Sequence, residues 1–219
     1  MLCVCCAEEQ GPEVVEIKLN SAFTGRAPPD EEPKLTPTQN AGFIVQRAAT
    51  DFIALVDRGC ISNNFGWTLD LMNETSLHIH ALRSGSTPLQ AYNSTASRGQ
   101  ELRVGDAIVA VDGRGGSAGE LSEAIKARAQ VELRVRRPMR FMCLTVRPAS
   151  QPMGLQINYE ETGSSLFIRS VGPGFISDSG LDIRAGDRIH SVSGVKGRPE
   201  ALLKALRDET TLVLVLTRV

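Results

Sequence analysis

The chain has 219 residues, of which 42% are hydrophobic and 22% charged, and its formal net charge is -1. This composition is typical of soluble globular protein, and the near balance of charges gives no overall attraction to nucleic acid, so no nucleic-acid partner is expected. The sequence contains neither a run of about 18 apolar residues nor a secretory leader, and we therefore expect a cytoplasmic protein.

Residues 1–49 predict a mostly disordered lead, because they contain the acidic and proline-rich tract APPDEEPKLTPTQ and little apolar periodicity beyond VVEIKL. The lead holds three of the five cysteines, Cys3, Cys5 and Cys6. They are candidates for S-acylation, which would place the protein peripherally at a membrane; the alternative is a solvated tail with reduced thiols. No histidine lies near them, so no metal site is expected.

From about residue 50 the sequence carries the same pattern twice. Gly105-Asp106 and Gly186-Asp187 lie 81 positions apart, and the later helical segments keep that offset. The first copy has about eight extra residues before its Gly-Asp turn, in the tract AYNSTASRGQ. The repeat predicts two domains, residues 50–138 and 139–219, with a linker too short for independent tumbling.

Each copy predicts a strand, a loop, two more strands, the Gly-Asp turn, a short strand, a long helix and a last strand. In the first copy the elements are expected at residues 52–56, 67–72, 77–82, 108–111, 118–129 and 131–135. In the second copy they are expected at residues 141–146, 155–158, 166–171, 189–192, 199–208 and 212–216. The fold class is therefore mainly β with short helices.

This order of elements, with an apolar-Gly-apolar step before the second strand, resembles the PDZ domain twice over, across residues 50–219. The resemblance implies two partly open antiparallel barrels, each with one long and one short helix. It also implies a non-enzymatic adaptor without a cofactor, which binds protein C-termini or extended peptides by strand addition.

The loop that binds a carboxylate in this family reads Asn64-Phe65-Gly66-Trp67 in the first copy and Pro152-Met153-Gly154-Leu155 in the second. Glycine permits the turn in which successive backbone N–H groups face one concavity. The resemblance therefore assigns peptide binding to these loops and to the residue that follows each. The assigned positions are Phe65, Gly66, Trp67, Thr68, Met153, Gly154, Leu155 and Gln156.

The family also uses the long helix and a basic residue ahead of the loop. On the helix, the resemblance assigns Ala118 and Ser122 in the first copy and Pro199 and Leu203 in the second. Arg58 and Arg147 match the basic position and either hold the carboxylate through water or end a strand in solvent.

An alternative function stays open because both loops depart from the family's GLGF-like pattern at the first glycine, where Asn64 and Pro152 stand. In this alternative the grooves are closed, and the tandem serves for tethering or oligomerisation without a peptide ligand. Asp106 and Asp187, at the Gly-Asp turns, are expected to bond local amides and not to take part in catalysis.

Three further signals are weaker. Seven basic residues lie between positions 126 and 147 against the single acid Glu132, which makes this stretch either a candidate contact with anionic membrane or a solvated strand face. His78 and His80 share one strand face and are expected to be surface histidines. Thr217-Arg218-Val219 resembles a PDZ ligand, which raises self-association or capture by another PDZ protein.

Overall fold

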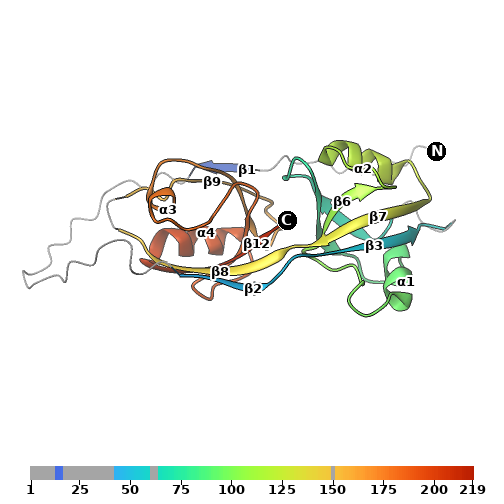
Figure 1. Cartoon of the computed structure of the whole chain (residues 1–219), viewed down its shortest axis with the longest axis horizontal. Helices are drawn as coiled ribbons and strands as arrows, with labels where there is room; N and C mark the ends of the chain where they lie inside the picture. The colour runs from blue at the N-terminus through green and yellow to red at the C-terminus, as the bar shows by residue number, and fades with distance from the viewer. Residues whose placement is uncertain (1–12, 17–41, 60–63, 149–150) are drawn as a thin grey trace, which may run out of the picture.

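The computed structural model describes residues 13–16, 42–59, 64–148 and 151–219. These residues form two lobes that lie side by side along the long axis of the molecule (Figure 1), each built on one antiparallel sheet. The predicted fold class, mainly β with short helices and open antiparallel sheets, is confirmed. No helix in the described ranges is long and apolar enough to cross a membrane.

The first lobe contains a five-stranded sheet in the order β3-β7-β6-β5-β4. Its elements are β3 (Thr50–Asp57), β4 (Trp67–Asp70), β5 (Leu77–Leu82), α1 (Pro88–Thr95), β6 (Ala107–Val111), α2 (Ala118–Lys126) and β7 (Gln130–Arg137). Helix α1 covers half of the extra tract, and Thr87 starts it by accepting a hydrogen bond from the Gln90 amide at 3.2 Å.

The second lobe contains a seven-stranded sheet in the order β1-β9-β10-β11-β12-β8-β2. Its elements are β1 (Glu13–Glu16), β2 (Gly42–Arg47), β8 (Met139–Val146), β9 (Leu155–Tyr159), β10 (Leu166–Val171), α3 (Phe175–Asp178), β11 (Arg188–Val192), α4 (Pro199–Asp208) and β12 (Thr211–Arg218). Strands β1 and β2 come from the lead, for which mostly disorder was predicted, while residues 1–12 and 17–41 lie outside the described part of the chain.

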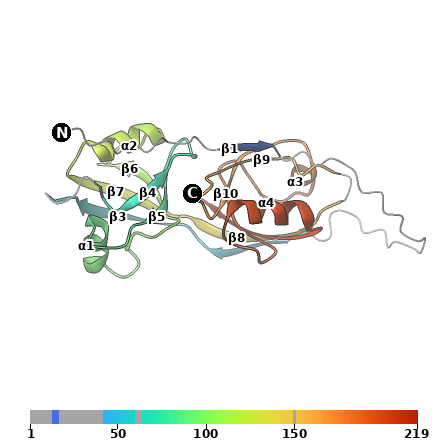
Figure 2. The same ribbon diagram turned by 180° about the vertical axis from the view of Figure 1, so that it is seen from behind.

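A two-stranded antiparallel ribbon crosses from one lobe to the other. Strand β2 pairs with β8 from Gly42 opposite Leu144 to Arg47 opposite Arg140, and β3 then pairs with β7 from Thr50 opposite Arg137 onward. Figure 1 shows this ribbon running beneath the second lobe and on into the first lobe, between α2 and α1, and Figure 2 shows it from behind. The ladder is interrupted at the junction, between Arg47 opposite Arg140 and Thr50 opposite Arg137. The lobes are therefore joined by two neighbouring chain crossings instead of one.

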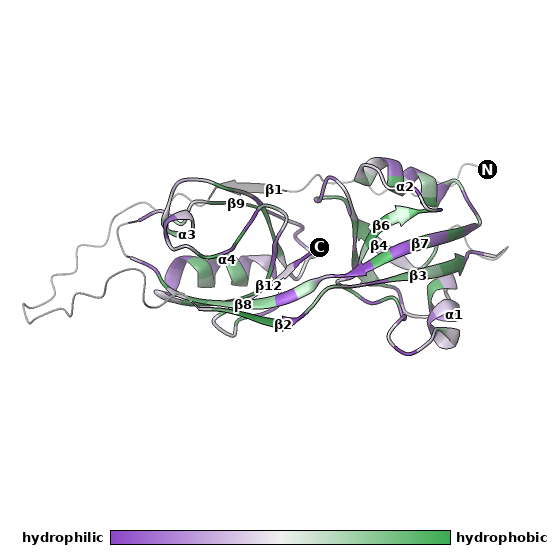
Figure 3. Ribbon diagram, viewed as in Figure 1, coloured by the Kyte–Doolittle hydropathy of each residue, from purple (hydrophilic) through white to green (hydrophobic). Residues whose placement is uncertain are grey.

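Each lobe has its own apolar core. In the first lobe, Leu121 and Ile125 of α2 pack with the inward residues of the sheet, and in the second lobe Leu202 and Leu206 of α4 do the same. Figure 3 shows apolar residues along β2 and β3 and hydrophilic ones where the ribbon crosses between the lobes. The side chains of the ribbon therefore change from apolar to hydrophilic at the junction between the lobes.

The Gly-Asp turns are held in the same way in both lobes. The Asp106 carboxylate accepts hydrogen bonds from the Arg103 amide at 2.9 Å and from the Arg137 guanidinium at 3.0 and 3.1 Å. The Asp187 carboxylate likewise accepts from the Arg184 amide at 2.8 Å and from Arg218. The expected structural role of both aspartates is confirmed.

These pairs correct two expectations about surface groups. Arg137 is 7% exposed and bonded to Asp106, so it does not belong to a solvated basic face. Thr217 and Arg218 lie in β12, where Arg218 bonds to Asp187, so they are not available as a free PDZ ligand.

A buried ion pair also joins the lobes. Arg188 of β11 donates to Asp70 of β4 at 2.7 Å, and the two side chains are 6% and 2% exposed. The Arg188 guanidinium also lies 5.0 Å from the centre of the Phe167 ring. Because both charges are removed from water, loss of one partner leaves the other unpaired in a medium that solvates it poorly.

We expect Arg188→Ala to lower the free energy of unfolding by about 3–5 kcal/mol, since it strands the buried Asp70 carboxylate. Urea unfolding followed by circular dichroism measures the change. Arg134→Ala is the control, because Arg134 pairs with Asp51 on the exposed face of the sheet and its loss should cost at most about 1 kcal/mol. Equal losses in the two variants would contradict the importance of the buried pair.

Candidate functional site

Both predicted carboxylate-binding loops contain a glycine in the left-handed region, with φ of 97° at Gly66 and 76° at Gly154. The space around them is also closed to side chains. A Cβ at Gly66 would lie 2.4 Å from the Thr87 Cβ, and one at Gly154 would lie 2.7 Å from the Gly172 carbonyl oxygen. Glycine is therefore needed at both positions for conformation and for packing.

The two loops differ in what their backbone amides bind. The Gly66 amide donates to Asn64 Oδ1 at 2.7 Å, so a side-chain oxygen of the loop itself occupies the place expected for a ligand carboxylate. Pro152 stands at the matching position of the second loop and has no such oxygen. In the described part of the chain, no group accepts a hydrogen bond from the Met153 or Gly154 amide.

The ends of the two long helices differ in a matching way. Helix α2 begins at Ala118, whose amide donates to the Glu74 carbonyl at 2.8 Å and so ties the helix to the connection between β4 and β5. Helix α4 begins at Pro199, which has no N–H and cannot make this bond. The first repeat is therefore bridged at its helix end, whereas the second repeat lacks this bridge.

The other predicted helix positions also differ. Ser122 of α2 is half-buried, whereas Leu203 of α4 is 4% exposed and belongs to the apolar core of the second lobe.

The side chains of Arg58 and Arg147 donate hydrogen bonds to carbonyls at the ends of the long helices, so they are not solvated strand ends. The Arg58 guanidinium donates to the carbonyls of Lys126 and Arg128, at the end of α2, and lies 5.2 Å from the centre of the Phe65 ring. Arg147 donates to the carbonyls of Leu206 and Arg207 in α4 at 3.0 and 2.7 Å. A cation at this end compensates the unpaired carbonyls and the negative pole of a helix.

The strands that follow the loops have different outer edges. Strand β4, with Trp67 and Thr68, is the last strand of its sheet among the described residues. Strand β9, with Leu155 and Gln156, is paired on its outer side with β1. The pairing is antiparallel and places Glu16 of β1 opposite Gln156, near the loop. An added strand at this position is what the PDZ resemblance assigns to a ligand. In the sequence, VVEIKL stands out only by its apolar periodicity within the lead, and this did not predict its partner.

The histidines of strand β5 do not both lie at the surface. His78 is 5% exposed and its Nδ1 atom has no hydrogen-bond partner, so the expectation of a surface residue was wrong for it. Burial, and then the positive charge of Arg188, hold the pKa of His78 well below its usual value. Among the described residues, no group of three or more His, Cys, Asp and Glu side chains is arranged to hold a metal ion.

No family model matches this chain. No curated protein matches its sequence. Among solved structures, similar ones are INAD PDZ45 in complex with the NG2 peptide, at 12% identity and a TM-score of 0.35 over 86% of this chain and 93% of that chain. The complex of INAD PDZ45 with NORPA CC-PBM is similar at 15% identity and a TM-score of 0.34, over 80% and 93% of the two chains. Both TM-scores are low, and the function proposed below depends on the geometry of the two repeats.

We expect Gly154→Ala to destabilise the protein by about 2 kcal/mol or more, because the new methyl group combines a positive φ with contact against backbone atoms. Gly180→Ala is the matched control, since Gly180 has a φ of 70° and open space around it. It should cost about 1 kcal/mol, the price of the backbone conformation alone. Equal midpoints of thermal unfolding for the two variants would contradict the tight packing around Gly154.

The free energy of unfolding should fall as the pH is lowered from about 6.5 towards 4. Burial, followed by the charges of Arg188 and Arg140, lowers the pKa of His190 to about 4, whereas an unfolded histidine has a pKa of about 6.5. In this window the unfolded chain binds more protons, so acid favours unfolding, on the order of 2 kcal/mol for this group. Urea titrations of wild type and His190→Gln measure it, and an equal loss in both would contradict the assignment to His190.

Proposed function

We propose that the protein is a non-enzymatic adaptor whose second repeat binds an extended peptide of a partner protein by strand addition to β9. The observation that supports this proposal is the pairing of β1 along β9, because it shows that an extended segment fits on that edge. Main-chain hydrogen bonds supply most of such binding and suit many sequences, while side chains add selectivity.

A partner that ends in a free carboxylate has an advantage over β1 at this site. The chain continues beyond Glu16, so β1 brings no terminal carboxylate to the loop. The amides of Met153 and Gly154 have no acceptor among the described residues, and a carboxylate bound there would contribute about 1.5–3 kcal/mol. We therefore expect C-terminal peptides of micromolar affinity, about 8 kcal/mol in total, to compete with β1.

The first repeat is proposed to be a structural copy. Asn64 occupies the amide of Gly66 at one end of its site, and the bond from Ala118 to Glu74 closes the other end. These contacts also favour a second candidate function for the whole chain, a tethering tandem without a peptide ligand, if β1 never leaves β9. The two candidates differ in whether a peptide binds once β1 is removed.

Membrane localisation remains a proposal that depends on Cys3, Cys5 and Cys6, which lie outside the described residues. Arg134 and Arg136 would supply an added contact with anionic lipid. Both pair with Asp51, and this carboxylate lowers the positive charge of their face. Acyl-exchange labelling of wild type and of a variant with the three cysteines changed to serine tests the anchor.

Removal of β1 should open the peptide site. In the full chain, Val14→Pro combined with Val15→Pro breaks the β1 ladder, because alternate amides of a strand face its partner and one of these two must donate to β9. We expect this variant to bind C-terminal peptides from a random library at least about tenfold more tightly than wild type, with amidated peptides binding weakly. Fluorescence polarisation measures the affinities.

Thr24→Pro with Gly25→Pro is the matched control, since it adds two prolines to the lead outside β1. It should bind as wild type does. If the β1 variant keeps its circular dichroism spectrum and thermal transition but binds no peptide, the adaptor proposal fails and the tethering tandem is favoured.

A further inference from the structure

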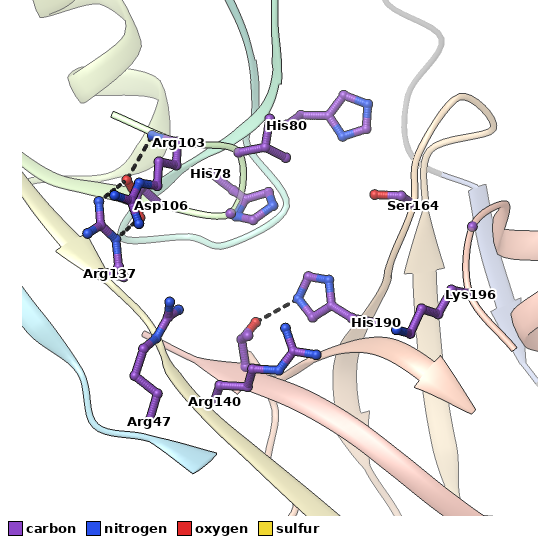
Figure 4. Close-up of a pocket in the computed structure, with 14 residues that line it drawn as sticks. Arg47, His78, His80, Arg103, Asp106, Arg137, Arg140, Ser164, His190 and Lys196 are labelled. Carbon is purple, nitrogen blue, oxygen red and sulfur yellow. Dashed lines mark hydrogen bonds and ion pairs between the residues drawn. The ribbon is translucent and has the colours of Figure 1, made fainter. Parts of the chain in front are cut away.

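A cavity of about 400 Å³ lies between the two lobes, and residues of both lobes and of the ribbon line it. Figure 4 shows His78 and His80 on one side of this space and Arg47, Arg140 and Lys196 on the other. Its lining is strongly basic. The charged lining residues are the cations Arg47, Arg103, Arg137, Arg140 and Lys196 and the single carboxylate Asp106.

Three of these cations have no carboxylate partner in the described part of the chain. Arg47 donates to the Pro138 carbonyl at 3.3 Å, and Arg140 donates to Gln46 Oε1 at 3.1 Å; both acceptors are neutral. Lys196 has no hydrogen-bond or ion-pair partner among the described residues.

The other charged groups of the cavity are paired. Arg137 is bound to Asp106, and Arg103 lies 2.8 Å from Glu101. Outside the cavity, Arg128 pairs with Asp112, whereas Arg114, Arg169 and Arg207 are exposed and have no carboxylate partner in the described part of the chain. The cavity differs from these scattered cations because three unpaired cations line one space. The three unpaired cations therefore leave an uncompensated positive charge around the cavity.

The titratable groups around the cavity respond to this charge. Burial lowers the pKa of Arg47, and the neighbouring positive charge of Arg137 lowers it further. The charge of Arg140 contributes, after burial and Arg188, to the lowered pKa of His190. His78 lines the same space, is 5% exposed, and has an Nδ1 atom without a partner. Like charges gathered around one space raise the free energy unless an anion joins them.

We propose that this cavity binds a small anion that carries several phosphate groups, either free in solution or as a lipid headgroup. Guanidinium groups bind phosphate oxygens through paired hydrogen bonds, and a lysine adds a compact charge. The volume lies within the range of small-molecule sites, about 300–1,000 Å³, and exceeds what one phosphate needs. Because Arg140 and Lys196 belong to the second lobe and Arg103 to the first, the anion bridges the lobes.

The test measures binding to the full chain by isothermal titration calorimetry with myo-inositol hexakisphosphate. Co-sedimentation with phosphatidylcholine vesicles, with and without bisphosphorylated phosphatidylinositol, forms the second arm. We expect the triple variant Arg47→Gln, Arg140→Gln and Lys196→Gln to lose at least about tenfold in affinity for the soluble probe. Binding in both arms identifies a headgroup that the cavity accepts, and binding in the first arm alone identifies a soluble ligand.

The control must change the net charge equally at exposed cations away from the cavity. Arg114→Gln, Arg169→Gln and Arg207→Gln together meet this condition, because none of the three has a carboxylate partner in the described chain and all are exposed. We expect this control to bind as wild type does. An equal loss of affinity in both triple variants would show that only net charge matters and would overturn the proposal. If folded wild type binds neither the soluble probe nor the vesicles, the proposal is also overturned.

Discussion

The ribbon formed by β2–β3 and β7–β8 is the constraint on which the rest of this structure depends. A single residue, Pro138, separates β7 from β8, and β2 and β3 run opposite them through both lobes. The lobes are thereby joined by two neighbouring chain crossings, residues 48–49 and Pro138, instead of a single linker. The buried pair of Arg188 and Asp70 and the basic cavity are consequences, because each needs residues of both lobes at fixed separation.

The two repeats have the same framework but unequal binding surfaces. The framework is maintained by the Asp106–Arg137 and Asp187–Arg218 pairs and by arginines that bind the ends of the long helices. The binding surfaces differ at two positions in each repeat. Asn64 and Ala118 fill hydrogen bonds in the first repeat that Pro152 and Pro199 leave unmade in the second. Small changes at equivalent positions thus distinguish the repeat that we propose to be structural from the repeat that we propose to bind a peptide.

The sequence was sufficient to predict most elements, because period-two alternation, turn glycines and i, i+4 apolar spacing are local signals. Helix α4 was predicted at its observed bounds, whereas α2 ends at Lys126, three residues earlier than predicted. Contacts between distant segments were beyond such reasoning. Nothing local in GFIVQR or EVVE identifies β8 or β9 as partner, and the burial of His78 and Arg137 follows only from the packing of the lobes.

The two strands that follow the loops have unequal edges, because β1 pairs along β9 whereas no described strand pairs with the outer side of β4. Amide hydrogen exchange of the wild-type chain, resolved by residue, tests it most directly, because exchange reports whether an amide is held in a ladder. The account predicts that the outward amides of β9 are protected while those of β4 exchange rapidly. Rapid exchange on the outward edge of both strands would contradict it and would leave β9 without the resident segment on which the peptide site is inferred.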